Sequence, residues 1–121
     1  MCALEESLIE ARPNLWLLPS NWETATLKTW FVLQDYRESR LAEALEPLAV
    51  DFIILDTAPS RDVLHTAAHH AASEIIIPVG LDYLALAGVL QEMDTLAALR
   101  KRGHGLDVLA VLPTFWDSST T

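Results

Sequence analysis

The sequence predicts an α/β fold in which a mostly parallel β-sheet is flanked by helices, within a single domain of residues 1–121. The apolar run at 52–55 lacks polar alternation, which is typical of a strand covered on both faces, and the runs at 74–79 and 107–113 are further predicted strands. Segments with helical periodicity separate these runs, so parallel β-α-β units with right-handed crossovers follow. A length of 121 residues with 51% hydrophobic residues is enough for one core.

The other expected elements follow from periodicity and helix-end signals. They are a short amphipathic helix at 1–11, a strand at 14–18, and helices at 22–34, 36–46, 61–72 and 82–103. Ser20 and Glu23 match a capping box at the start of the third element, and Ser60 and Asp82 are candidate caps for the last two helices. Alanines such as Ala67 and Ala68 would let the helix at 61–72 approach the sheet closely.

The carboxyl ends of the predicted strands meet at one edge of the sheet. That edge would hold Pro19-Ser20, Asp56-Thr57, Val79-Gly80 and Pro113-Thr114. Ligands of open α/β sheets bind at such an edge. Asp56 ends the apolar run at 52–55, so its carboxylate is the first candidate for a metal-binding or catalytic group.

The charge balance restricts the possible partners. The chain has 8 basic and 17 acidic residues, a net charge of −9, so it is a poor DNA binder by itself. No apolar stretch reaches the roughly 18 residues of a membrane span, and the acidic start does not resemble a signal peptide. The single cysteine, Cys2, excludes an internal disulfide, and a cytoplasmic location is expected.

Four segments in order resemble the ParA/MinD family of deviant Walker ATPases, nearest to its ParA (Soj) branch. They are "NLWLLPSNWETATLK", "LAEALEPLAVDFIILDTAPS", "AAHHAASEIIIPVGLDYLALAGVLQEMDTL" and "DVLAVLPTFWDSST". The second resembles the Walker B segment of that family, usually "yDyiiiDtpPs". The resemblance covers the whole chain and implies a partial P-loop NTPase fold and a role in chromosome or plasmid partitioning.

The resemblance assigns roles to five residues. Asp56 matches the aspartate that supports Mg²⁺ and the attacking water, so it is the expected catalytic and metal-binding residue. Thr57 and Pro59 belong to the same turn, and Pro113 and Thr114 match positions that contact adenine and ribose. The resemblance thus implies ATP and Mg²⁺ as cofactors. It also implies that the chain forms a homodimer and binds a partition partner protein.

The sequence departs from the family in its phosphate-binding loop. The family motif "KGGxGKT" is absent: the glycines are Gly80, Gly88, Gly103 and Gly105, and neither lysine, Lys28 or Lys101, follows one. "RGHG" at 102–105 is interpreted as a helix stop. Relative to the family, the domain is expected to be truncated at both ends and to hydrolyse no ATP alone.

Two alternative functions stay open. The chain can be a non-catalytic interaction or dimerisation module, or a remnant, that keeps the ParA fold without the enzyme. A receiver domain is a minor alternative, since its phosphoacceptor aspartate ends an apolar strand, as Asp56 is predicted to do. This chain lacks the acidic pair, the hydroxyl residue and the lysine that a receiver also needs.

Two further groups of side chains have a functional and a structural interpretation. His65 and His69 lie four residues apart, with Asp62 one turn earlier, which could hold zinc or form an ordinary polar helix face. In the family this helix carries no metal. Trp16, Trp22, Trp30 and Trp116 are expected to pack in a core or an interface rather than to stack on a ligand.

Overall fold

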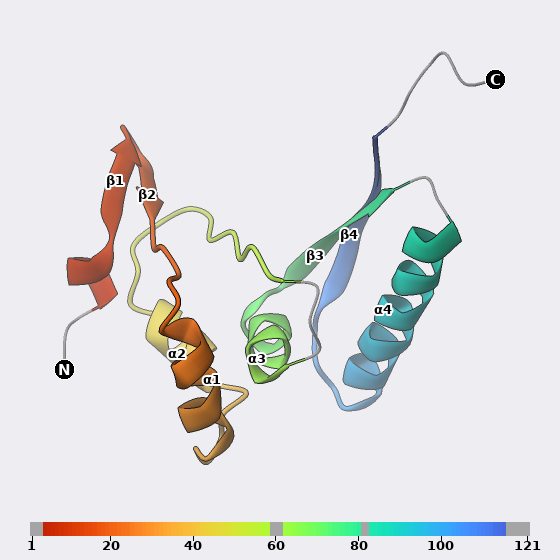
Figure 1. The fold of residues 1–121 in the computed structure, drawn as a ribbon, viewed down its shortest axis with the longest axis horizontal. Helices are drawn as coiled ribbons and strands as arrows, with labels where there is room; N and C mark the ends of the chain where they lie inside the picture. Colours follow the sequence, from red (N-terminus) through yellow and green to blue (C-terminus); the bar gives the residue numbers. More distant parts are fainter. Residues whose placement is uncertain (1–3, 59–61, 81–82, 116–121) are drawn as a thin grey trace. The chain divides into compact units, whose positions relative to one another are not determined.

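The structure is a computed structural model that describes residues 4–58, 62–80 and 83–115 (Figure 1). The predicted cap residues Ser60 and Asp82, together with Pro59 and Trp116, lie outside these ranges. The chain divides into two compact units, residues 1–71 and 72–121, and each is described by itself.

The second unit contains the predicted parallel strand pair. Strand β3 (Glu74–Gly80) is followed by helix α4 (Tyr83–Lys101) and strand β4 (Asp107–Thr114). β3 and β4 pair in parallel, from Glu74 opposite Asp107 to Gly80 opposite Thr114, with one irregularity after Ile75. The strands predicted at 74–79 and 107–113 are confirmed, and so is their parallel arrangement.

Helix α4 covers one face of this strand pair, as Figure 1 shows. Ile77 of β3, Leu96 and Leu99 of α4, and Leu106 before β4 form the buried core of the unit. Along β3 the side chains alternate between buried and exposed, with Ile77 and Val79 buried and Ile76 exposed. Within the second unit, α4 therefore covers the face of β3 that carries Ile77, and Ile76 points to the other face.

The end of α4 is fixed by a glycine in the left-handed conformation. Gly103 has φ +83°, its N–H donates to the Arg100 carbonyl at 2.9 Å, and the N–H of His104 donates to the Leu99 carbonyl at 3.1 Å. These two bonds form a Schellman motif, which satisfies carbonyls that the helix end leaves open. The interpretation of residues 102–105 as a helix stop is confirmed.

The first unit starts with a β-hairpin, so the helix predicted at 1–11 is wrong. A short 3-10 helix (Leu4–Ser7) precedes strand β1 (Ile9–Arg12), which pairs antiparallel with β2 (Leu15–Leu17). Asn14 sits in the turn with φ 62°. A proline followed by an asparagine at positive φ is typical of a tight turn. This turn folds β1 back onto β2, and strand pairing overrides the weak helical periodicity.

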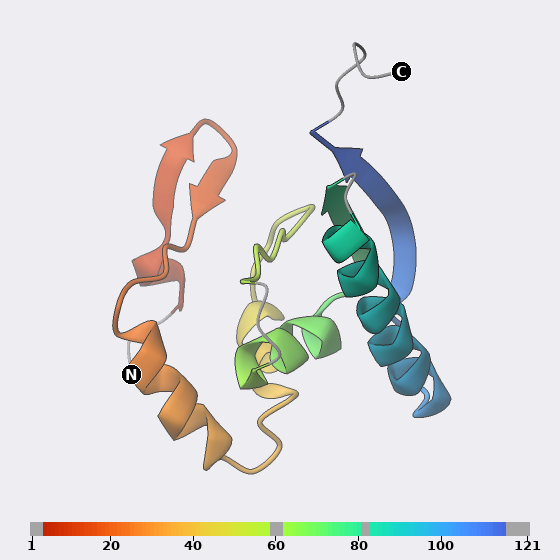
Figure 2. The ribbon, with the colours of Figure 1, turned by 45° about the vertical axis from the view of Figure 1, so that its right-hand side comes forward.

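Three short helices follow in the first unit: α1 (Thr24–Val32), α2 (Arg40–Leu45) and α3 (Val63–Ala71). α3 contacts both α1 and α2 (Figure 2). Its Ala67 and Ala68 are buried, and the helix that carries them packs on α1 and α2, whereas the sequence predicted close approach to the sheet. The helix predicted from residue 36 starts later, because Tyr36 has a φ of 53°, which no helix residue adopts.

The predicted capping box of Ser20 and Glu23 is wrong. The side-chain oxygen of Asn21, not of Ser20, accepts the N–H of Glu23 at 2.9 Å, and Glu23 itself makes no side-chain cap. At the start of α3 the cap is Asp62, whose Oδ1 accepts the N–H groups of Leu64 and His65 at 3.0 and 3.1 Å. An aspartate side chain satisfies the open N–H groups of a first helical turn well.

The segment predicted as the strand at 52–55 is not in a sheet. Residues 52–58 carry no regular structure, and the side chains of Phe52 and Ile54 are 89% and 91% exposed. A strand exists through hydrogen bonds to a neighbouring strand, and the described residues provide none for this segment. Its apolar composition is that of a buried strand, but composition alone does not supply the partner.

Leu96 carries much of the packing in the second unit, since its side chain is only 2% exposed. We expect Leu96→Ala to lower the free energy of unfolding by about 2–5 kcal/mol, through lost apolar burial and the cavity left behind. Leu90→Ala on the same helix is the control, because Leu90 is 68% exposed and should change stability by about 0.5 kcal/mol or less. Urea unfolding followed by circular dichroism measures both, and equal effects would contradict the assignment of the core.

Gly88 and Gly103 should respond oppositely to alanine. A Cβ at Gly88, inside α4, meets no atom within 4 Å, so Gly88→Ala should stabilise by up to about 1 kcal/mol through helix propensity. Gly103→Ala should destabilise by roughly 1 kcal/mol, because alanine is strained at φ +83°. Thermal unfolding of the two variants distinguishes them, and stabilisation by both would show that the helix does not end at Gly103.

Candidate functional site

Asp56, the first candidate, presents an exposed side chain at the end of the apolar segment in the first unit. Thr57 follows it and is exposed as well, whereas Pro59 lies outside the described residues. An exposed carboxylate suits Mg²⁺, which prefers hard oxygen ligands and keeps several of its waters. The chemistry of Asp56 therefore fits one ligand of a hydrated magnesium ion.

The other two predicted site residues end β4 in the second unit. Pro113 lies opposite Val79 and Thr114 opposite Gly80, so the carboxyl ends of β3 and β4 do meet at one edge. Pro113 is exposed and Thr114 half-buried. The expected edge is confirmed for these two strands. Pro19-Ser20 and Asp56-Thr57 belong to the first unit, where Pro19-Ser20 follows β2 of the antiparallel hairpin and Asp56-Thr57 follows no strand.

The chain just after the Asp56 segment is anchored by Asp62. Besides capping α3, its Oδ2 forms an ion pair with the Lys28 ammonium on α1. Both side chains are partly exposed, so the pair contributes little energy, but it joins the first turn of α3 to α1. Lys28, one of the two lysines, thus has a structural role here.

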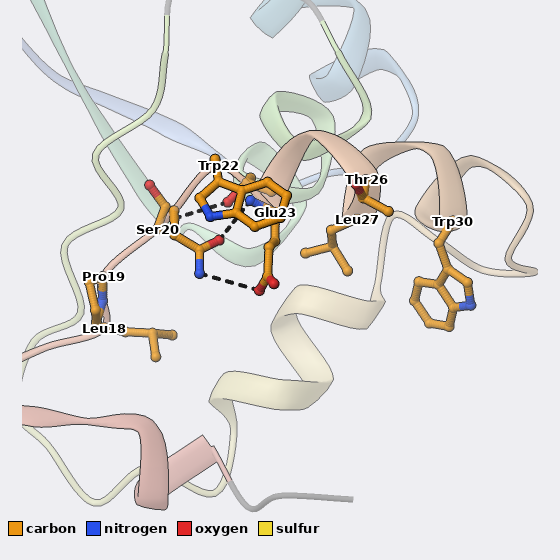
Figure 3. A pocket seen from close by; sticks show the side chains of 10 residues that line it. Leu18, Pro19, Ser20, Trp22, Glu23, Thr26, Leu27 and Trp30 are labelled. Atoms are coloured by element: carbon orange, nitrogen blue, oxygen red, sulfur yellow. Dashed lines mark hydrogen bonds between the residues drawn. The ribbon is translucent and has the colours of Figure 1, made fainter.

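A shallow pocket of about 770 Å³ lies beside α1 and was not expected from the sequence (Figure 3). It is lined by the segment from Leu18 to Thr24 and by Thr26, Leu27 and Trp30. Trp22 is 82% exposed, and the Glu23 carboxylate accepts a long 3.4 Å hydrogen bond from the Asn21 amide. Trp30 is also exposed, at 53%, so neither of these two tryptophans is buried in the core. The turn "PSNWE" was the only sequence signal for this pocket.

The described glycines do not form a phosphate cradle. Gly80 ends β3, Gly88 is inside α4, and Gly103 closes the Schellman motif, while Gly105 follows in the link to β4. A phosphate loop needs consecutive backbone N–H groups that converge on the anion at a helix start. Among the residues that the structure describes, the chain thus offers a fitting ligand for Mg²⁺ but no glycine-rich binding loop for the phosphates.

No helix in the described part of the chain is long and apolar enough to cross a membrane.

Comparison with known proteins identifies the relatives of this chain. The family described as "AAA domain" matches residues 1–107. The chromosome partitioning protein ParA of Myxococcus xanthus is 37% identical over 108 residues, which are 86% of this chain and 38% of that protein. The sporulation initiation inhibitor protein Soj of Bacillus subtilis is 34% identical over 110 residues, 88% of this chain and 44% of that protein.

The solved structures agree. Cobyrinic acid a,c-diamide synthase from Mycobacterium smegmatis superimposes with a TM-score of 0.89 at 32% identity, over 99% of this chain and 50% of that one. The same enzyme was crystallised with ADP and magnesium and with an ATP analogue and magnesium. This similarity confirms the predicted class of fold, an α/β fold of the P-loop ATPase type.

The chain belongs to the AAA domain family, among its ParA/MinD-like P-loop ATPases. It spans less than half the length of the ParA and Soj relatives it matches. The sequence-based resemblance to the ParA branch is thereby confirmed.

Proposed function

We propose that residues 1–121 form one ParA-like domain that acts as the Walker B half of a chromosome- or plasmid-partitioning ATPase. The observation that carries this proposal is the similarity to ParA and Soj across nearly the whole chain, which includes the "FIILDTAPS" segment. Asp56 is the proposed catalytic residue and magnesium ligand. Thr57 and Pro59 shape the turn beside it, and Pro113 and Thr114 provide the nucleoside contacts.

The chemistry of the described residues sets what this half can do. Magnesium, when bound, neutralises charge on the phosphates of ATP. The Asp56 carboxylate would hold one side of the hydrated ion and orient it toward the phosphates. Positioning the phosphates themselves needs a glycine-rich loop that carries a lysine, and neither Lys28 nor Lys101 follows a glycine in these 121 residues. We therefore propose that the isolated chain binds ATP weakly and does not hydrolyse it.

Exposed apolar side chains favour a second candidate function, a non-catalytic interaction or dimerisation module. Many large hydrophobic residues are at least 40% exposed in each unit, including Leu33, Tyr36 and Phe52 in the first and Leu86, Leu90 and Leu109 in the second. Extended apolar surface of this kind is covered by partners in most proteins. A second copy of the chain or a partition partner protein would bury it without any nucleotide.

A fusion tests the first proposal. Joining the chain behind the part of Myxococcus xanthus ParA that precedes the matched region should give ATP hydrolysis in a phosphate-release assay. Asp56→Ala should lower that rate by at least about 100-fold, because several kcal/mol of charge stabilisation are lost. Asp51→Ala is the matched control, an exposed aspartate at the other end of the same apolar segment, and should keep the rate. Equal losses for both variants would contradict the role of Asp56.

The interaction module makes a different prediction. Sedimentation analysis of the chain over a hundredfold concentration range should show a reversible dimer that forms equally well with and without Mg-ATP, since burial of apolar surface drives it. A chain that stays monomeric throughout would rule out self-association as its function. A dimer that forms only with Mg-ATP would favour the ATPase proposal instead.

A further inference from the structure

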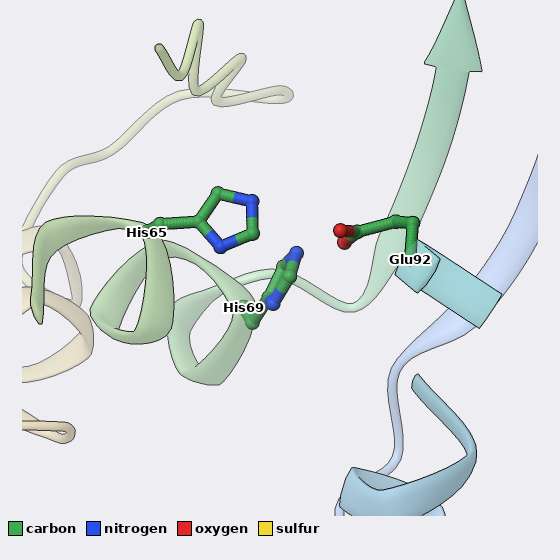
Figure 4. A group of neighbouring side chains, drawn as sticks. All are labelled: His65, His69 and Glu92. Atoms are coloured by element: carbon green, nitrogen blue, oxygen red, sulfur yellow. The ribbon is translucent and has the colours of Figure 1, made fainter. Parts of the chain in front are cut away.

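Helix α3 brings two histidine side chains together. His65 and His69 lie one helical turn apart, their ring centroids are 4.2 Å apart, and the rings meet edge to face at 64° (Figure 4). A ring nitrogen of each is within 4.8 Å of a ring nitrogen of the other. His65 is half-buried and His69 is 6% exposed, so the pair is neither a solvated surface face nor fully enclosed.

Asp62, which the sequence suggested as a third zinc ligand, makes other contacts in the structure. One oxygen of Asp62 accepts the N–H groups that open α3, and the other pairs with Lys28. A carboxylate held in this way is committed to the helix start and to the α1 ion pair. The donor set that α3 itself offers is therefore a pair of imidazoles.

A histidine pair at this spacing is a metal-binding arrangement in its own right. Helical zinc sites place two histidines at i and i+4 because both side chains then project from one face of the helix. Imidazole nitrogen suits Zn²⁺, Ni²⁺ and Cu²⁺, whereas Mg²⁺ prefers oxygen ligands. Nitrogen ligands of one zinc ion lie at about 2.0–2.1 Å from it, so the two ring nitrogens, within 4.8 Å of each other, have to approach each other when they share an ion.

The sequence around the pair argues against a hydrolytic metal centre. The catalytic helix motif H-E-x-x-H carries a glutamate general base directly after its first histidine. Here that position is Thr66, whose hydroxyl donates to the Asp62 carbonyl at 3.2 Å. The site would hold a metal ion without supplying this base.

We propose that His65 and His69 bind one divalent transition-metal ion of the zinc class, one ring nitrogen each. Water or donors outside the pair fill the other coordination positions. Glu92, also labelled in Figure 4, belongs to the other unit, so the proposed ligands are the two histidines alone. This site is separate from the proposed magnesium ligand Asp56 and does not depend on ATP binding.

Isothermal titration calorimetry of the tag-free chain with Zn²⁺ tests the proposal. We expect one Zn²⁺ per chain, and His65→Gln and His69→Gln should each weaken binding by at least about tenfold, because each removes one of two protein ligands. His70→Gln is the matched control, a histidine on the same helix that is not part of the pair, and should bind as the unaltered chain does. An Mg²⁺ titration should not displace the zinc.

A second measurement does not depend on the folding of any variant. Zinc should shift the ring nitrogen resonances of His65 and His69 in NMR spectra of the unaltered chain, and leave those of His104 in place. No zinc binding, shifts spread over all histidines, or affinity unchanged in both glutamine variants would overturn the proposal. Loss of ATP turnover in the fusion protein would not bear on it, so the two proposals fail independently.

Discussion

The fold of the second unit depends on the packing of helix α4 against the parallel strands β3 and β4. Parallel strands need a long crossover connection, and here α4 is that connection and also the cover of one sheet face. The core of Ile77, Leu96, Leu99 and Leu106 lies where α4 meets the strands. Gly103 then turns the chain so that β4 can start beside β3. Ile76, next to Ile77 along β3, points to the other face and is exposed.

The sequence predicted best where local signals and tertiary packing agree. β3, α3, α4 and β4 were expected within about two residues, because apolar strands there alternate with helices that end at clear stop signals. It failed at 1–11, where the Pro13-Asn14 turn outweighed weak helical periodicity, and at 52–55, where a strand needs a partner that composition cannot supply. The capping-box pattern predicts Ser20 as the cap, but the side-chain oxygen of Asn21 accepts the Glu23 N–H.

The sequence motif predicted the candidate residue Asp56, but it did not predict how the side chains around the candidate sites are arranged. Asp56 was found because it closes an apolar run that resembles Walker B, and relatives named ParA and Soj support that origin. The sequence did not predict the pocket beside Trp22, because tryptophan side chains are expected to be buried by packing rather than exposed beside a pocket. The ring contact between the two histidines on α3 and the capping role of Asp62 could be seen only in the structure.

We propose, as the central claim, that this chain carries a magnesium-binding carboxylate of a ParA-like ATPase without the phosphate cradle. Equilibrium titration of the 121-residue chain with a fluorescent ATP analogue, in the presence and absence of Mg²⁺, tests it most directly. We expect no saturable binding below about 1 mM, a binding free energy weaker than roughly −4 kcal/mol, because one carboxylate holds a hydrated ion only loosely. Saturable, Mg²⁺-dependent binding in the micromolar range would contradict it.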